Sequence, residues 1–198
     1  MMLTEVMAVP AAALPVSQFR DHLRLGTGFT DSGLEDSLLE TYLRAALAAV
    51  EAWTGKALIQ RTYRIDTDAW AIPNAQDLPV GPARSVTEVA LLTADGGSTV
   101  VAPTRYRLVN DTHEPRVESL AATLPAIPIG GMGRVTFDAG FGPAWTNVPA
   151  DLGHAVILLA SYYYEYRHEA RLGAQKIPYG VTRLLASWRP IRIGGRSR

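Results

Sequence analysis

The chain has 198 residues, of which 47% are hydrophobic, with 19 basic and 19 acidic side chains. This length and hydrophobic content fit one domain with an ordinary soluble core. The formal net charge of +0 argues against a protein that binds DNA through a global basic excess. With 0 cysteines in the sequence, disulfides, thiolate nucleophiles and cysteine-ligated metal centres are excluded.

The N-terminal segment, residues 1–16, is mildly apolar and holds no basic residue. Pro10 and Pro15 interrupt it, so it does not predict a signal peptide. No uninterrupted apolar run approaches the roughly 20 residues of a membrane span. We therefore expect a protein that is synthesised in the cytoplasm and has no membrane partner.

Apolar side chains spaced by three and four residues predict long helices at 34–53 and 152–166. Shorter helices are predicted at 18–25 and 181–188, the second ended by Pro190. The stretch at 152–166 is apolar around most of its circumference. That is more apolar surface than a monomer of this size easily hides, so it predicts packing against copies or partners.

Between the long helices the periodicity changes to two, which is typical of strands. A turn at Asp95-Gly96-Gly97 predicts a hairpin. The absence of intervening helical patterns indicates an antiparallel sheet or a small sandwich. The strands are predicted at 59–66, 86–93, 99–102, 106–109, 116–120 and 134–139.

These elements predict an α+β fold: a helical bundle, made of N-terminal helices and a long C-terminal helix, with an inserted antiparallel β region. The domain is predicted to cover 17–189, with the insertion at about 59–142. After Glu169 no acidic residue occurs, so residues 190–198 are predicted to form a basic, flexible tail.

The sequence shows few residues in patterns that indicate catalysis or metal binding. The four histidines lie in separate segments without ligand spacing, and no serine lies in a Gly-x-Ser-x-Gly elbow. Asp66 and Asp68 could face one side of a strand and bind a cation, but a solvated strand face is favoured because no third carboxylate is near. We therefore predict no catalytic residue, no metal site, no cofactor and no enzymatic activity.

The run Tyr162-Tyr163-Tyr164, with Tyr166, could stack on nucleobases. Helical geometry spreads these rings around the axis instead of forming a platform. Packing in the core or between subunits is favoured.

Short motifs in a fixed order carry a resemblance that runs from about Phe19 to Arg189. The motifs are ALIQRT at 57–62, LPVGP at 78–82, SVTEV at 85–89, YRL at 106–108, VTFDAGFG at 135–142, VPADL at 148–152, YEYR at 164–167 and IPYGV at 177–181. In this order they resemble the head-to-tail connector (adaptor) family of long-tailed phages and phage-derived gene transfer agents. Residues 1–16 and the arginine-rich terminus lie outside the resemblance.

The resemblance implies a structural protein of the virion, located at the head-to-tail junction and made in the host cytoplasm. Such a protein forms a ring beneath the portal, extends the DNA channel and offers its far side to a stopper or tail-completion protein. A ring of about twelve copies would let each subunit bury two different faces against its neighbours. DNA would pass through the lumen without sequence-specific binding, and net neutrality fits a wall along which DNA slides.

Two sets of residues follow as candidates. The set expected to bind the portal combines a short helix with the basic tail and consists of Leu184, Trp188, Arg189, Ile191, Arg192, Arg196 and Arg198. The set expected at the subunit interface follows the long helices and consists of Leu38, Tyr42, Trp53, Leu159, Tyr162, Tyr163 and Tyr166.

The alternative function is a DNA-binding packaging accessory protein that uses the basic tail and the tyrosines on DNA. It predicts a DNA affinity that falls steeply with salt.

Overall fold

The computed structural model describes residues 1–25, 32–167 and 177–189. The chain divides into two compact units. The first, here called the β unit, consists of Met1–Ala8 and Gly55–Phe141. The second, the helical unit, consists of Val9–Thr54 and the described residues from Gly142 onward.

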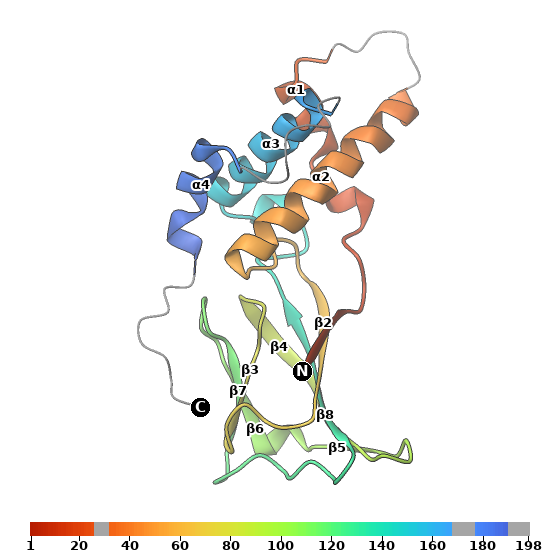
Figure 1. Ribbon diagram of the computed structural model, residues 1–198, viewed down its shortest axis with the longest axis vertical. Coiled ribbons are helices and arrows are strands. Elements are labelled where there is room, and N and C mark those ends of the chain that lie inside the picture. Colours follow the sequence, from red (N-terminus) through yellow and green to blue (C-terminus); the bar gives the residue numbers. More distant parts are fainter. Residues whose placement is uncertain (26–31, 168–176, 190–198) are drawn as a thin grey trace. The chain divides into compact units, whose positions relative to one another are not determined.

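The β unit holds two antiparallel sheets (Figure 1). The five-stranded sheet has the order β1-β2-β8-β4-β5, with β1 at Met2–Glu5, β2 at Arg61–Thr67, β8 at Met132–Ala139, β4 at Ala83–Leu92 and β5 at Ser98–Val100. The three-stranded sheet has the order β3-β7-β6, with β3 at Ala75–Asp77, β7 at Arg116–Ser119 and β6 at Tyr106–Val109.

The two sheets share one hydrophobic core. Period-two alternation on β2 and β8 sends Tyr63, Ile65 and Phe137 to the inner side, and the rings of Tyr63 and Phe137 stack with centroids 5.8 Å apart. Val117 of the three-stranded sheet belongs to the same cluster. The β region is therefore a unit with its own core.

The outer face of the five-stranded sheet is polar. Arg134 on β8 donates to both carboxylate oxygens of Asp66 on β2, at 2.7 and 3.2 Å, and Arg64 lies 3.5 Å from Asp66 Oδ2. Asp138 accepts hydrogen bonds from Thr62 and Ser85. The face predicted to be solvated therefore carries ion pairs, in which arginines on β2 and β8 neutralise the charge of Asp66.

The helical unit contains four α-helices among the described residues. Its elements are η1 at Ala11–Ala13, α1 at Val16–His22, α2 at Ser32–Thr54, η3 at Trp145–Asn147, α3 at Ala150–Glu165, α4 at Tyr179–Leu185 and η4 at Ala186–Trp188. Helix α3 contacts α1, α2 and α4. The core side chains are at most 1% exposed and include Phe19, Leu39, Leu43, Val50, Leu152, Leu159 and Leu185.

Two expectations about the helices are wrong. The fold is α+β, but it is not a bundle with a long C-terminal helix. The longest described helix, α2, has 23 residues, α3 has 16, and the last α-helix, α4, has 7. Helix α3 also does not carry surplus exposed apolar surface, because α1, α2 and α4 lie around it and cover Leu152, Val156 and Leu159. Periodicity reports which residues are apolar but not how many neighbours cover them. None of the helices in the described part of the chain is long and apolar enough to cross a membrane.

Candidate docking surfaces of the helical unit

Three of the residues expected to bind the portal lie in the described part of the chain. Leu184 is half-buried on α4, Trp188 is half-buried at the end of η4, and Arg189 is exposed. The Trp188 Nε1–H donates to Asp151 Oδ2 at 2.6 Å, and the Arg189 guanidinium lies 4.9 Å from the centroid of the Trp53 ring. These contacts fix the end of η4 against the start of α3 and the end of α2.

The other four members of that set, Ile191, Arg192, Arg196 and Arg198, lie outside the described residues.

The tyrosines expected at the subunit interface gather at the far end of α3. The ring of Tyr42 on α2 meets that of Tyr164 edge-on at 5.8 Å, and Tyr162 lies 4.7 Å from Tyr166 and 6.3 Å from Tyr163. Burial, followed by the neighbouring Tyr162, raises the pKa of the Tyr163 phenol above its usual value.

The members of the interface set differ in how much of each side chain is available. Leu38 is 44% exposed, Tyr166 41% and Trp53 38%, whereas Leu159 is 1% exposed and packs inside the unit. Tyr42, Tyr162 and Tyr163 are half-buried. The accessible part of the set therefore consists of Leu38 and aromatic side chains, and it lies on α2 and at the end of α3.

The structure divides the candidates into two groups. Trp53, Asp151, Trp188 and Arg189 meet at the start of α3, and the tyrosines meet at its end. Residues 151 and 164 are thirteen positions apart, so at about 1.5 Å per residue the groups are about 20 Å apart along the helix. Trp53 was expected in the interface set but lies with the portal-binding candidates.

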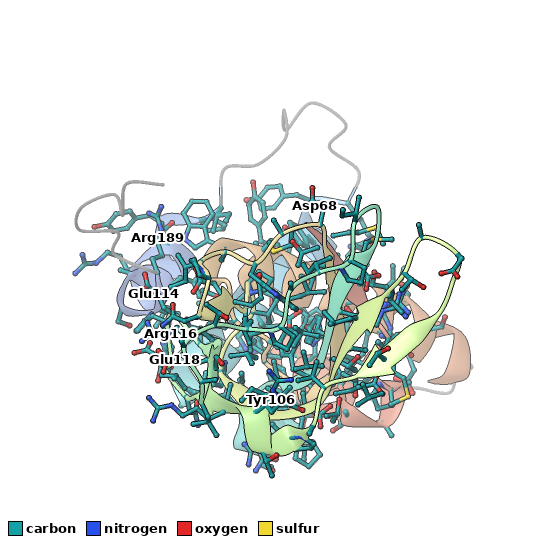
Figure 2. The ribbon with its side chains drawn as sticks, turned by 90° about the horizontal axis from the view of Figure 1, so that it is seen from below. Asp68, Tyr106, Glu114, Arg116, Glu118 and Arg189 are labelled. Carbon is teal, nitrogen blue, oxygen red and sulfur yellow. The ribbon has the colours of Figure 1, made fainter. Side chains whose placement is uncertain are left out.

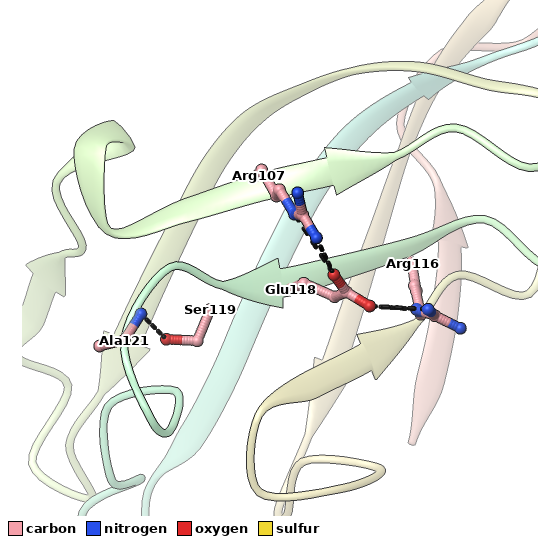
Figure 3. Close-up of polar contacts among 5 residues, drawn as sticks. All are labelled: Arg107, Arg116, Glu118, Ser119 and Ala121. Atoms are coloured by element: carbon pink, nitrogen blue, oxygen red, sulfur yellow. Dashed lines mark hydrogen bonds and ion pairs between the residues drawn. The ribbon is translucent and has the colours of Figure 1, made fainter.

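The β unit contributes a charged cluster that sequence analysis missed. The Glu118 carboxylate on β7 accepts hydrogen bonds from Arg107 Nη2 at 2.9 Å and from Arg116 Nε at 2.7 Å (Figure 3). The bond from Arg107, followed by that from Arg116, holds the pKa of Glu118 below its usual value. Figure 2 shows Glu114, Arg116 and Glu118 in succession along one side of this unit. The signal available in the sequence was the alternation of charge at 114, 116 and 118.

The two carboxylates considered for a cation site, Asp66 and Asp68, lie in different surroundings. Asp66 is paired with Arg134 and Arg64, and Asp68 is exposed. Within residues 1–25, 32–167 and 177–189, no three histidine, aspartate or glutamate side chains are placed to hold a metal ion.

Comparison with known proteins shows which solved structures the chain is similar to. No family model and no curated protein match it. Among solved structures, it is similar to a chain in the "Neck of empty GTA particle computed with C6 symmetry", with 52% identity and a TM-score of 0.90, covering 100% of both chains. It is also similar to a chain in the "Virion of native gene transfer agent (GTA) particle", with 52% identity and a TM-score of 0.87, again covering 100% of both. A chain in the "Neck of native GTA particle computed with C12 symmetry" matches with 47% identity, a TM-score of 0.85 and coverage of 100% of both.

A sequence identity of 47–52% over the full length places the chain in a class of proteins, the structural components of gene transfer agent necks. The chain belongs to the head-to-tail connector (adaptor) family of these particles.

Proposed function

We propose that the chain is the head-to-tail adaptor of a gene transfer agent or tailed-phage particle. In this proposal it forms a ring of about twelve copies beneath the portal and extends the DNA channel. Its far side meets a stopper or tail-completion protein, and DNA passes through the lumen without sequence-specific binding. The role is structural and involves no catalysis or cofactor. The protein is made in the host cytoplasm and resides in the virion.

The observation that carries the proposal is the full-length similarity, at 52% identity, to a chain of a particle neck. The C6 and C12 symmetries used for the related necks support a cyclic arrangement. In such a ring each copy contacts its two neighbours through two different surfaces. The helical unit offers two separate aromatic groups, one at each end of α3, that can serve on different surfaces.

We assign portal docking to the end of η4 and the basic tail. Arg189 and the arginines at 192, 196 and 198 would meet carboxylates of the portal, and Ile191 would add an apolar anchor. Trp188 is held by Asp151, so it positions the start of the tail for docking.

Deletion of residues 191–198 tests this assignment. We expect the shortened chain to lose co-purification with the portal, while its own thermal unfolding stays unchanged. A triple variant, R192Q/R196Q/R198Q, should show most of the same loss. The matched variant R192K/R196K/R198K keeps the charge and should retain binding if charge attraction dominates. Full binding by the deleted chain would exclude the tail from docking.

The adaptor role itself is tested by the mass of the purified protein, alone and mixed with portal. We expect a complex whose mass fits one portal plus a ring of about twelve copies. Particles that lack the chain should fail to join tails. Normal tail joining without it would refute the adaptor role.

A further inference from the structure

Helix α2 has one face that carries no charged side chain, here called the outer face. At 3.6 residues per turn, its members fall within an arc of about 160° around the helix. They are Ser37, Leu38, Thr41, Tyr42, Ala45, Ala48, Ala49, Ala52 and Trp53. Each of these side chains is exposed or half-buried, and Leu38 is 44% and Trp53 38% exposed. The described part of the chain therefore leaves this face uncovered.

An uncharged outer face is unusual for a helix that also packs in a core. A surface helix normally directs its charged side chains to water, opposite its buried side. On α2 the buried side is present and includes Leu43, but the charged side chains lie outside the arc. Asp36 pairs with Arg20, and Glu40 pairs with Arg44. The composition of the outer face therefore suits contact with another segment better than contact with water.

The last described residue lies at one end of the outer face. The Arg189 guanidinium is 4.9 Å from the centroid of the Trp53 ring, and Trp53 is the final member of the face. Residues 190–198, which lie outside the described residues, therefore start beside it. A segment tethered so close has an effective concentration on the order of millimolar at the face, above that of a second copy in dilute solution. The tether favours the chain's own segment as the occupant.

The apolar residues of this segment match the middle of the outer face. An extended chain advances about 3.3 Å per residue, and an α-helix about 1.5 Å. Measured from Trp53 toward the start of α2, Ile191 and Ile193 would come about 7 and 13 Å along the helix, level with the alanines at 45, 48 and 49. Alternate residues of an extended chain point to the same side, so both isoleucines can face α2 while Arg192 points away.

The charges of the segment match the start of α2. In the same extended path, Arg196 and Arg198 would come about 23 and 30 Å from Trp53. Glu35, in the first turn of α2, lies about 27 Å from Trp53 along the helix axis. Acidic side chains prevail on α2, whose charged residues are Glu35, Asp36, Glu40, Arg44 and Glu51, whereas residues 190–198 include arginines and no acidic residue. Opposite charges therefore meet where the apolar contacts end.

We propose that residues 190–198 fold back along the outer face of α2 in the isolated chain and cover it. Ile191 and Ile193 contact the alanines, and Arg196 and Arg198 approach the acidic first turn. While the segment lies there, it keeps a second copy off this face. The portal is proposed to bind the same segment, so docking would uncover the outer face as the ring assembles, and this last step rests on the proposed function.

Thiol labelling of the isolated chain tests the proposal. The sequence has 0 cysteines, so Ala45→Cys supplies a single thiol on the outer face, and Ala69→Cys supplies a control thiol at an exposed position of the β unit. Alkylation by a small neutral reagent is measured for the full chain and for the chain without residues 191–198, at several concentrations. We expect the thiol at 45 to react about 10-fold more slowly in the full chain, at every concentration, and the thiol at 69 to react equally in both. A local contact of this strength opens before the chain unfolds, so the melting temperature stays the same.

A pair of tail variants identifies the contact. Ile191→Ser with Ile193→Ser should remove the protection of the thiol at 45, and Ile191→Val with Ile193→Val should keep it. Equal labelling rates in the full and shortened chains would overturn the proposal. Protection that survives the deletion and grows with concentration would overturn it as well, because a second copy would then cover the face.

Portal binding by a variant of α2 separates this proposal from the proposed function. Ala45→Lys with Ala48→Lys puts positive charge on the outer face and repels the arginines without changing the segment itself. A segment that lies on α2 about nine-tenths of the time weakens portal binding about 10-fold, so the variant should bind portal about 10-fold more tightly, and Ala69→Lys should bind as the unmodified chain does. Portal binding without this gain would overturn the fold-back. Absence of portal binding by every variant would refute the docking role of the tail, and the labelling experiment, which uses no portal, would still decide the fold-back.

Discussion

Replacing Trp188 by phenylalanine tests whether η4 is fixed to α3. The change keeps an aromatic ring but removes the Nε1–H that donates to Asp151 Oδ2 at 2.6 Å. A hydrogen bond to a charged group contributes about 1.5–3 kcal/mol when buried. Both side chains here are half-buried, so we expect a loss of about 1 kcal/mol, which lowers the melting temperature of a chain of this size by about 2–4 °C.

The assay is a double-mutant cycle of Trp188→Phe and Asp151→Ala, followed by thermal unfolding. Asp151 also lies in the first turn of α3, where a carboxylate stabilises the helix, and the cycle subtracts that effect. We expect a coupling free energy of about 1 kcal/mol between the two positions. If the two single losses add to within about 0.3 kcal/mol, the bond does not hold η4 and the reasoning fails.

Three further predictions concern the β unit. Phe137→Ala should destabilise it by about 3–5 kcal/mol, because the ring is 0% exposed and stacks on Tyr63, and a small effect in urea unfolding would contradict the shared core. Gly133→Ala places a methyl group 2.5 Å from the Trp70 ring, so it should cost about 1–3 kcal/mol, with Gly180→Ala as the control variant, because its Cβ meets no neighbour within 4 Å. The pKa of Glu118 is lowered in the folded state, so its contribution to stability is present at pH 7 and is lost as pH falls below the unfolded value of about 4.5. Glu118→Gln should therefore make the free energy of unfolding depend less on pH between pH 5 and pH 3. An unchanged pH profile would contradict this.

Sequence periodicity located most elements because each depends on local pattern. The helices predicted at 34–53 and 152–166 are observed at Ser32–Thr54 and Ala150–Glu165, and the strand predicted at 106–109 is observed at Tyr106–Val109. Helix α2 ends before Gly55, which has a φ of 66° and therefore adopts the left-handed conformation that commonly terminates a helix.

The sequence could not reveal pairings between distant segments. Strand β1 was missed because Met2–Glu5 shows no alternation, and its partner β2 begins at Arg61. Strand β3 was missed because three residues between prolines carry too little pattern. The burial of α3 depended on neighbours from three other helices, which periodicity cannot count.

The same limit applies to the candidate sites. Composition marked aromatic and basic side chains, but the contact between Arg189 and Trp53 requires that the end of α2 and the residue after η4 meet in space. The cluster around Glu118 likewise depends on the register that places Arg107 opposite it.

The division of the helical unit into two chain segments has a consequence for biosynthesis. Helix α2 ends at Thr54, and α3, against which it packs, begins at Ala150. Ribosomes add about 5–20 residues per second, so the apolar side of α2 stays without its partner helix for on the order of 5–20 s, until α3 has been synthesised. The β unit is complete at Phe141 and can fold in that interval. We therefore expect the sheets to fold on the ribosome first, and the unfinished helical unit to be the stage at which nascent chains need chaperones.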